Sequence, residues 1–347
     1  MVWRWTLDGC GPMELKKALA RALKLLPTKK DEAKLLRLIP GAEGCPSWVC
    51  GSDGIVTSVV FVEETLPNAL FDATVIKTAV KDTGSLSFTP VGYGDYYLRS
   101  ESADYLLKGL DVNAYSVFLN IPPLDLFEEC VLWQNVKAAT HAAGKTLEDY
   151  GVVHFHPDYV ESLAKGRLAR AKVKGRWQGL IPAKLFKTWP KGKVRTYFDR
   201  AYGFFLIGEE EVRYSPLVNV GFPDTNGIIP EHTTGAVYFF STKELFEVVR
   251  QTAALAALGI IKLEFGEGLL TLRAWEEGGV GKVITASVEV DHAQGHQEGW
   301  VQINGKVLQE ALKHAPESST RLCYTGDVGH PLRLDSGSLT ICIWQMG

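Results

Sequence analysis

The sequence predicts an α+β protein built from three similar units, and three observations support this. Six amphipathic helical patterns alternate with runs typical of antiparallel strands. The helices recur at close to a third of the 347-residue chain. Two proline-bearing segments, NIPPLD at 120–125 and GFPDTNGIIP at 221–230, separate the thirds, and a proline cannot donate a strand's ladder hydrogen bond. We therefore expect domains at 1–122, 123–222 and 223–347.

Each unit is expected to open with a long helix and to contain a shorter second one. Long helices are expected at 13–26, 126–145 and 242–258, and they begin 113 and 116 residues apart. Second helices are expected at 68–80, 182–189 and 304–315, and these begin 114 and 122 residues apart. Each unit should therefore hold two helices packed on antiparallel sheets.

Strands are expected between and after these helices, where β-branched and aromatic residues are frequent. The clearest runs are 54–62, 85–91, 115–121, 151–157, 194–199, 203–208, 260–265, 268–275, 283–290, 332–334 and 339–344. SPLVNV at 215–220 and VYFF at 237–240, which flank GFPDTNGIIP, are also typical of strands.

The composition is that of a globular protein, with 46% hydrophobic and 22% charged residues. No apolar run approaches the roughly 18 residues that a membrane span needs, and the N-terminus lacks the apolar core of a signal peptide. We expect a cytoplasmic protein with no membrane partner and no cofactor. The cysteines are too scattered for a disulfide framework and are expected to be reduced thiols: Cys10, Cys45, Cys50, Cys130, Cys323 and Cys342.

Basic charge is concentrated on the helices of a chain whose net charge is −3. The segments 13–37, 70–82, 125–145, 183–193, 241–258 and 304–315 hold 20 of the 37 Lys and Arg residues but 11 of the 40 acidic ones. Within the first helix, Lys17, Arg21 and Lys24 lie on a stripe opposite the apolar one. For any single helix, an ordinary solvated face is the alternative explanation.

If all six helices faced one concave surface, their cations would contact nucleic-acid phosphates without reading bases. The expected DNA-binding residues are Lys17, Arg21, Lys24, Lys29, Lys30, Lys77, Lys81, Lys137, Lys145, Lys184, Lys187, Arg250, Lys306 and Lys313.

Several segments, in order along the whole chain, resemble the bacterial sliding clamp, the β subunit of the replicative DNA polymerase. GFPDTNGIIP resembles that family's RFPDY-x-x-x-x-P joint between its second and third domains. VCGSDGIVTSVVFV resembles the TATDxE strand pair, SLAKGRLARAKV the VATDGHRLA stretch, and GLIPAKLF the V-x-VP-x-K helix entry. VQINGKVLQEALKH and PLRLDSGSLTICIW resemble the last helix, hairpin and closing strand.

The resemblance implies a DNA-clamp fold and a non-catalytic processivity subunit. Two copies would join head to tail into a ring around duplex DNA, with the helices inside. The implied partners are duplex DNA, a second copy of the chain, a DNA polymerase and a clamp loader.

The resemblance also implies a peptide-binding pocket between the second and third domains. The positions that match it are Gly166, Arg167, Leu168, Pro223, Ile228, Ile341, Ile343 and Trp344. The chain departs from the family at Gly227, where a basic residue is frequent, and at its ICIWQMG ending, where Trp344 stands in place of a proline. Simple packing of a domain junction is the alternative role for these residues.

Two motifs suggest enzymes instead. His154, His156 and Asp158 in HFHPD alternate along an expected strand, as in a metal-dependent hydrolase. GGVGKV at 278–283 resembles a phosphate loop but lacks the G-x-x-x-x-G-K-[ST] spacing, so we interpret it as a turn. The hydrolase is kept as the alternative function.

Overall fold

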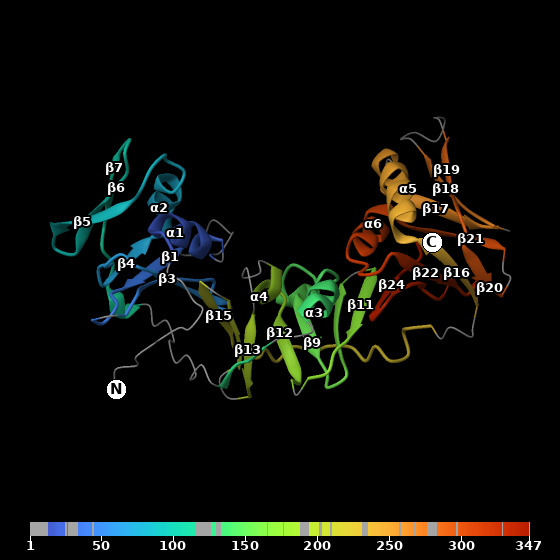
Figure 1. Ribbon diagram of the computed structural model, residues 1–347, viewed down its shortest axis with the longest axis horizontal. Helices are drawn as coiled ribbons and strands as arrows, with labels where there is room; N and C mark the ends of the chain where they lie inside the picture. Colours follow the sequence, from blue (N-terminus) through green and yellow to red (C-terminus); the bar gives the residue numbers. More distant parts are fainter. Residues whose placement is uncertain are drawn as a thin grey trace. The chain divides into compact units, whose positions relative to one another are not determined.

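In the computed structural model the chain forms two compact structural units (Figure 1). These are numbered separately from the three similar units expected from the sequence. Unit 1 comprises Met1–Val131 and Thr188–Leu217, and unit 2 comprises Leu132–Lys187 and Val218–Gly347. The structure describes residues 13–24, 26, 34–43, 45–114, 126–129, 133–164, 166–175, 177–187, 194–200, 203–208, 210–230, 235–256, 258–266, 268–275, 283–295, 298–327 and 329–346.

Unit 1 contains an eight-stranded and a three-stranded antiparallel sheet. Its helices are α1 (Leu15–Leu23), α2 (Ala73–Ala79) and a 3₁₀ turn at Val112–Ala114. Its strands are β1 (Leu35–Ile39), β2 (Ser47–Ser52), β3 (Thr57–Val62), β4 (Ala69–Asp72), β5 (Ser87–Gly92), β6 (Asp95–Arg99), β7 (Asp104–Leu107), β8 (Glu128–Glu129), β13 (Arg195–Asp199), β14 (Gly203–Ile207) and β15 (Glu211–Ser215). The sheet orders are β4-β1-β2-β3-β15-β14-β13-β8 and β5-β6-β7.

Unit 2 contains a nine-stranded and a four-stranded sheet. Its helices are α3 (Trp133–Thr140), α4 (Lys184–Lys187), α5 (Thr242–Leu255), α6 (Gly305–Lys313) and a 3₁₀ turn at Leu147–Asp149. Its strands are β9 (Val152–Phe155), β10 (Tyr159–Ala164), β11 (Arg167–Lys172), β12 (Gly179–Pro182), β16 (Ala236–Ser241), β17 (Ile260–Phe265), β18 (Leu269–Trp275), β19 (Val283–Glu289), β20 (His292–Gln294), β21 (Gly299–Asn304), β22 (Ser319–Tyr324), β23 (Leu332–Ser336) and β24 (Leu339–Ile343). The sheet orders are β12-β9-β10-β11-β24-β23-β22-β16-β20 and β19-β18-β17-β21.

One strand order occurs three times along the chain. It appears as β4-β1-β2-β3, as β12-β9-β10-β11 and as β21-β17-β18-β19, each with the outermost strand leading directly into a second helix. Three further strands then follow, β5–β7, β13–β15 and β22–β24. In each repeat the two helices contact each other, α1 with α2, α3 with α4, and α5 with α6. The α+β class with two helices per repeat is therefore confirmed.

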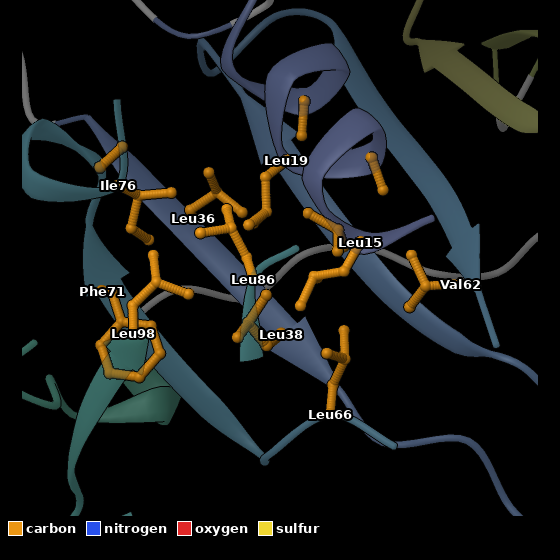
Figure 2. Close-up of a cluster of buried hydrophobic side chains, with 14 of the residues drawn as sticks. Leu15, Leu19, Leu36, Leu38, Val62, Leu66, Phe71, Ile76, Leu86 and Leu98 are labelled. Atoms are coloured by element: carbon orange, nitrogen blue, oxygen red, sulfur yellow. The ribbon is translucent and has the colours of Figure 1, made fainter. Parts of the chain in front are cut away.

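The helix layer of unit 1 covers one face of its large sheet. Leu15 and Leu19 of α1 and Ile76 of α2 pack on Leu36 and Leu38 of β1, with other buried apolar residues around them (Figure 2). Burying aliphatic side chains of this size stabilises a fold by about 1.5–3 kcal/mol each. Helix α1 lies directly on β2 at Gly51, where a Cβ would stand only 2.6 Å from the Ala22 carbonyl oxygen.

The opposite face of the same sheet is also buried, by an aromatic cluster. Successive residues alternate between the two faces, so Val60 belongs to the helix-covered core whereas Val59 and Phe61 belong to the second cluster with Phe205. This explains why TSVVFV in β3 is almost continuously apolar rather than alternating.

Several element boundaries differ from the sequence predictions. The first helix was expected at 13–26, but α1 ends at Leu23, and β1 begins at Leu35, inside the segment 13–37 that was counted with the helices. β4 occupies the expected start of the second helix, and only Ser215 of SPLVNV lies in a strand. The strand expected at 115–121 and the joint at 120–125 lie outside the described residues. The described helices include none with the length and apolar character that spanning a membrane requires.

Candidate nucleic-acid and peptide sites

The two helices of unit 1 bring four lysines around one surface hollow. Lys24 lies at the end of α1, Lys34 precedes β1, and Lys77 and Lys81 lie on and just after α2; all four line the hollow. None of the described residues that line it is acidic. We call these four residues the lysine hollow. Such a group attracts phosphates because its charges add at one place without opposing carboxylates.

Arg21 departs from the stripe expected for it. Its side chain is only 14% exposed, with Nη1 2.6 Å from Glu210 Oε2 and Nε 2.8 Å from Glu211 Oε2. The long guanidinium side chain therefore reaches β15 and is occupied there. Lys17, by contrast, is 72% exposed and pairs with Glu14 at 3.1 Å.

Most of the other expected cations lie on or near the helices of unit 2. Lys137, Lys145, Arg250, Lys306 and Lys313 are exposed, whereas Lys184 is half-buried. Arg250 contacts Glu247 at 2.6 Å and Lys313 is 3.9 Å from Glu310. Lys29, Lys30 and the side chain of Lys187 lie outside the described residues. A role in DNA binding stays a prediction for all of these cations.

The segment 221–230 lies along the nine-stranded sheet and is fixed at two points. Near its middle, Thr225 Oγ1 donates to Glu161 Oε2 at 2.7 Å and Arg170 Nη2 donates to Thr225 Oγ1 at 2.7 Å. At its end, Arg333 Nη1 donates to the Pro230 carbonyl at 2.5 Å. Figure 1 shows this segment running past β9, β11 and β24 on its way to β16. GFPDTNGIIP is thus an ordered linker and not a strand.

The linker lies on the face of the sheet that is opposite α3. Ser162 and Ala169 are direct partners in β10 and β11, and Ser162 Oγ donates to the Ala139 carbonyl of α3. The adjacent partners, Glu161 and Arg170, contact the linker instead. Since neighbouring residues alternate between faces, β10 and β11 each present one set to α3 and one to the linker. We call the second side the linker face.

This alternation divides the residues expected for the peptide pocket. Arg167 and Ile343 are opposite each other in β11 and β24, and so are Ala169 and Ile341, which places Ile341 and Ile343 on the α3 side. Both isoleucines are at most 1% exposed. Leu168 pairs with Cys342 on the linker face.

The remaining pocket residues lie on or beside the linker face. Trp344 is two residues after Cys342, so the same alternation places both on one side of the sheet. The Trp344 N–H donates to the Gly166 carbonyl at 3.0 Å. Pro223 and Ile228 are half-buried in the linker itself. Thr340 and Cys342 were not expected in the site, although their alternation with Ile341 could have indicated them. Whether these residues bind a peptide stays a prediction.

The polar centre of the linker face consists of ionisable groups with displaced pKa values. Burial acts to raise the pKa of Glu161, but hydrogen bonds from His154 and Thr225 and the charge of Arg170 lower it overall. Burial and the neighbouring His154 lower the pKa of His156. Burial also raises the pKa of the Cys342 thiol to about 12, so this cysteine is an unreactive packing residue.

Asp158 does not join the histidines in the arrangement expected for a hydrolase. In the described part of the chain the acidic residue grouped with His154 and His156 is Glu161, while Asp158 is exposed. The signal that was missed is the strand turn, which brings β10 back beside β9 and sets Glu161 directly opposite His154.

Solved structures with a similar fold include bacterial DNA polymerase sliding clamps. The DNA polymerase III β chain of Streptococcus pneumoniae superposes with a TM-score of 0.77 and 17% identity, covering 96% of this chain and 97% of that one. The sliding clamp of Bacillus subtilis gives 0.76 and 16%, and the β subunit of Thermotoga maritima gives 0.75 and 19%, both with 96% and 97% coverage. No family model matches the chain, and no curated protein matches it in sequence.

These similarities do not favour the metal-dependent hydrolase as the alternative function, because the proteins of like fold are clamps and the expected ligand set is not the one that forms. They extend over almost the whole of both chains at identities below 20%. Over 96% of its length, the chain has the fold of the bacterial DNA polymerase III β sliding clamps.

Proposed function

We propose that the protein is a DNA sliding clamp, which encircles duplex DNA without sequence specificity and tethers a DNA polymerase. The observation that carries this is the threefold repetition of one strand order, each repeat with its own pair of cation-bearing helices. The similarity to clamps over 96% of the chain supports it. Its role is to hold partners on DNA, and it performs no chemistry.

The repeat also indicates how two copies would close a ring. In the strand orders given above, the strand at the end of one repeat (β3 or β11) pairs antiparallel with the last strand in sequence of the next repeat. β3 pairs with β15 in this way, and β11 pairs with β24. By the same rule, β19 of the third repeat would pair with β7 of the first repeat in a second copy. In the described part of the chain, β19 pairs only with β18 and β7 only with β6.

Both of these edges carry exposed apolar side chains. Val283 in β19 is 48% exposed and Leu106 in β7 is 46% exposed. Unpaired edges with apolar side chains associate readily, and natural proteins normally protect them. A head-to-tail dimer with two such junctions would cover both edges of each chain.

DNA would be held by charge and topology together. The lysine hollow supplies phosphate contacts from α1 and α2, and the exposed cations of α3, α5 and α6 supply others. Individual contacts of this kind are weak and exchange rapidly, which permits sliding, while the closed ring prevents escape.

Partners would dock on the linker face at the half-buried Pro223, Ile228 and Trp344, beside a fixed polar centre. Leu168 and Cys342 on the same face are fully buried and would support that surface without being contacted. The polymerase and the clamp loader are the partners that this function requires. We place the protein in the cytoplasm, in keeping with the lack of disulfides at the described cysteines Cys45, Cys50, Cys323 and Cys342.

The test combines mass and retention. In solution the chain should have about twice its 38.2 kDa mass. Loaded on circular DNA, it should persist in salt that screens phosphate contacts and should escape when the circle is cut. Leu106→Asp should abolish both properties, whereas Leu258→Asp, at a site 78% exposed in a turn, should abolish neither. A monomer, or equal loss from circular and cut DNA, refutes the proposal.

A further inference from the structure

Two histidines and a glutamate converge on the linker face. His154 of β9 and Glu161 of β10 are direct partners across the strand pair, and His156 follows two residues after His154 on the same side. His154 Nδ1 and His156 Nε2 are each 3.4 Å from Glu161 Oε1. The same two nitrogens are 3.0 Å from each other.

The triangle formed by these three atoms has the dimensions of one face of a tetrahedral metal site. Zinc binds histidine nitrogen and carboxylate oxygen at about 2.0–2.2 Å, so two ligand atoms in tetrahedral geometry are roughly 3.3–3.5 Å apart. Two of the observed edges are 3.4 Å and the third is 3.0 Å. We propose that His154, His156 and Glu161 form a binding site for Zn²⁺ or a similar divalent transition-metal ion.

Surrounding contacts hold each ligand in place. Glu161 Oε2 accepts hydrogen bonds from Arg170 Nε at 3.0 Å and from Thr225 Oγ1 at 2.7 Å, which leaves Oε1 directed at the imidazoles. The ring of Phe222 lies against His154, with 4.8 Å between centroids. Outer contacts that orient metal ligands in this way raise metal affinity by 10- to 100-fold.

His156 is oriented by stacking. Its ring stacks on Tyr159 at 4.1 Å, and the Arg170 guanidinium covers the Tyr159 ring, also at 4.1 Å. Arg170 thus fixes both the carboxylate and the aromatic support of one imidazole.

The donor set selects the kind of ion. Two imidazoles and one carboxylate suit zinc and its neighbours, whereas Mg²⁺ and Ca²⁺ prefer sites built of oxygen alone. The side chains of His154 and His156 are 24% and 25% exposed, and that of Glu161 is 2% exposed. Water can therefore reach the fourth position from the surface while the carboxylate stays buried.

A bound ion would restrain the linker through Glu161. Glu161 joins the metal-binding triangle to Thr225 through one carboxylate, so the ion would stiffen the linker next to Pro223 and Ile228. The site and its test do not depend on whether the chain encircles DNA.

The experiment is calorimetric titration of the full chain, free of added histidines, with Zn²⁺. One equivalent should bind, and the thermal unfolding temperature should rise with Zn²⁺ concentration. The double variant His154→Asn/His156→Asn should bind at least 100-fold more weakly. Thr225→Val should weaken binding by about 10-fold, because it removes an outer hydrogen bond. His292→Asn, at an exposed histidine of β20, should bind like the parent.

Two outcomes overturn the proposal: no saturable binding by the parent, or equal binding by the double variant. A measurement that needs no variant is the visible spectrum of the Co²⁺-loaded chain, which should show intense tetrahedral bands. Octahedral bands that are unchanged in the double variant would also overturn it, since the ion would then bind elsewhere. Far-ultraviolet circular dichroism confirms that the double variant is folded.

Discussion

Replacing Glu211 with glutamine is expected to destabilise unit 1 by about 3–5 kcal/mol. The Glu211 side chain is fully buried in β15, at the junction with β3. Its carboxylate accepts hydrogen bonds from Ser58 Oγ at 2.6 Å, from Arg213 Nη2 at 3.1 Å and from Arg213 Nε. It also forms an ion pair with Arg21 Nε at 2.8 Å. One buried acid therefore contacts two guanidinium groups.

The magnitude follows from what the substitution leaves behind. Glutamine keeps the shape but removes the negative charge and turns one acceptor into a donor that faces an arginine. Arg213 is 2% exposed, so its charge has no access to water. Removing the charge of one partner of a buried ion pair costs up to about 3–5 kcal/mol, because a close favourable charge is lost where water cannot replace it.

The assay is thermal and urea unfolding followed by circular dichroism. For a unit of this size the loss corresponds to a fall of roughly 10 °C in Tm. Glu14→Gln is the matched control, because the Glu14–Lys17 pair is exposed and should contribute less than about 1 kcal/mol. Arg21→Ala should lower stability as well, without the loss of DNA affinity expected for a phosphate contact. A Glu211→Gln protein as stable as the control would refute this account of the junction.

Three other outcomes are expected. Changing all four residues of the lysine hollow to glutamine should weaken binding to linear duplex DNA. The slope of the logarithm of the binding constant against the logarithm of salt concentration should become shallower by roughly one unit per lost phosphate contact. An unchanged slope would mean that the hollow is not part of the DNA site. Trp344→Ala should weaken binding of a labelled polymerase peptide bearing adjacent Leu and Phe at least about 10-fold. The control Trp300→Ala, at a tryptophan of β21 that is 52% exposed, should bind like the parent. Equal affinities of the two variants would place the peptide elsewhere. The free energy of unfolding should fall by up to about 3 kcal/mol between pH 6.5 and about 4. Burial lowers the pKa of His141 from 6.5 to about 4, so in that range the unfolded chain binds a proton that the folded chain does not. Unfolding midpoints of the parent and of His141→Gln across this range test it, and identical pH slopes would contradict it.

The sign of the His141 effect follows from its surroundings. Its Nδ1 donates to the Ala138 carbonyl, so the neutral ring carries no proton on Nε2. Nε2 is buried and, among the described residues, has no hydrogen-bond partner. The stacked His314 and the nearby Arg167 further oppose a positive charge there.

Helix positions were largely predictable from the sequence, because they depend on local periodicity. The run 242–258 contains α5 and the run 304–315 contains α6, each with a polar cap, Ser241 and Asn304, at its start. The errors occurred where local pattern and tertiary pairing disagree. LLRLI in β1 continues a helix-like apolar pattern but pairs with β2 and β4, and it is a strand because those neighbours supply its hydrogen bonds.

The site shows the same division more sharply. The sequence indicated that 166–168, the linker and the closing strand come together. In unit 2, β11 pairs with the closing strand β24, and the linker contacts Arg170 of β11 and Arg333 of β23. It did not determine which side of the closing strand faces the linker. A shift of one residue in a strand exchanges its two faces, and only the pairing of Leu168 with Cys342 decides between them.

The sequence alone determined the class of fold, the threefold repetition and the concentration of cations on helices, because each follows from residue type and short-range spacing. Only the tertiary structure decided what each charge does. Arg21 and Lys24 lie on one helical stripe, yet Arg21 is bound to Glu210 and Glu211, at the start of a strand about 190 residues later in the chain, and Lys24 is exposed in the hollow that Lys77 also lines. Likewise, Glu161 joins His154 and His156 because a strand turn sets it opposite them. Such partners are fixed by long-range packing, which residue spacing does not encode.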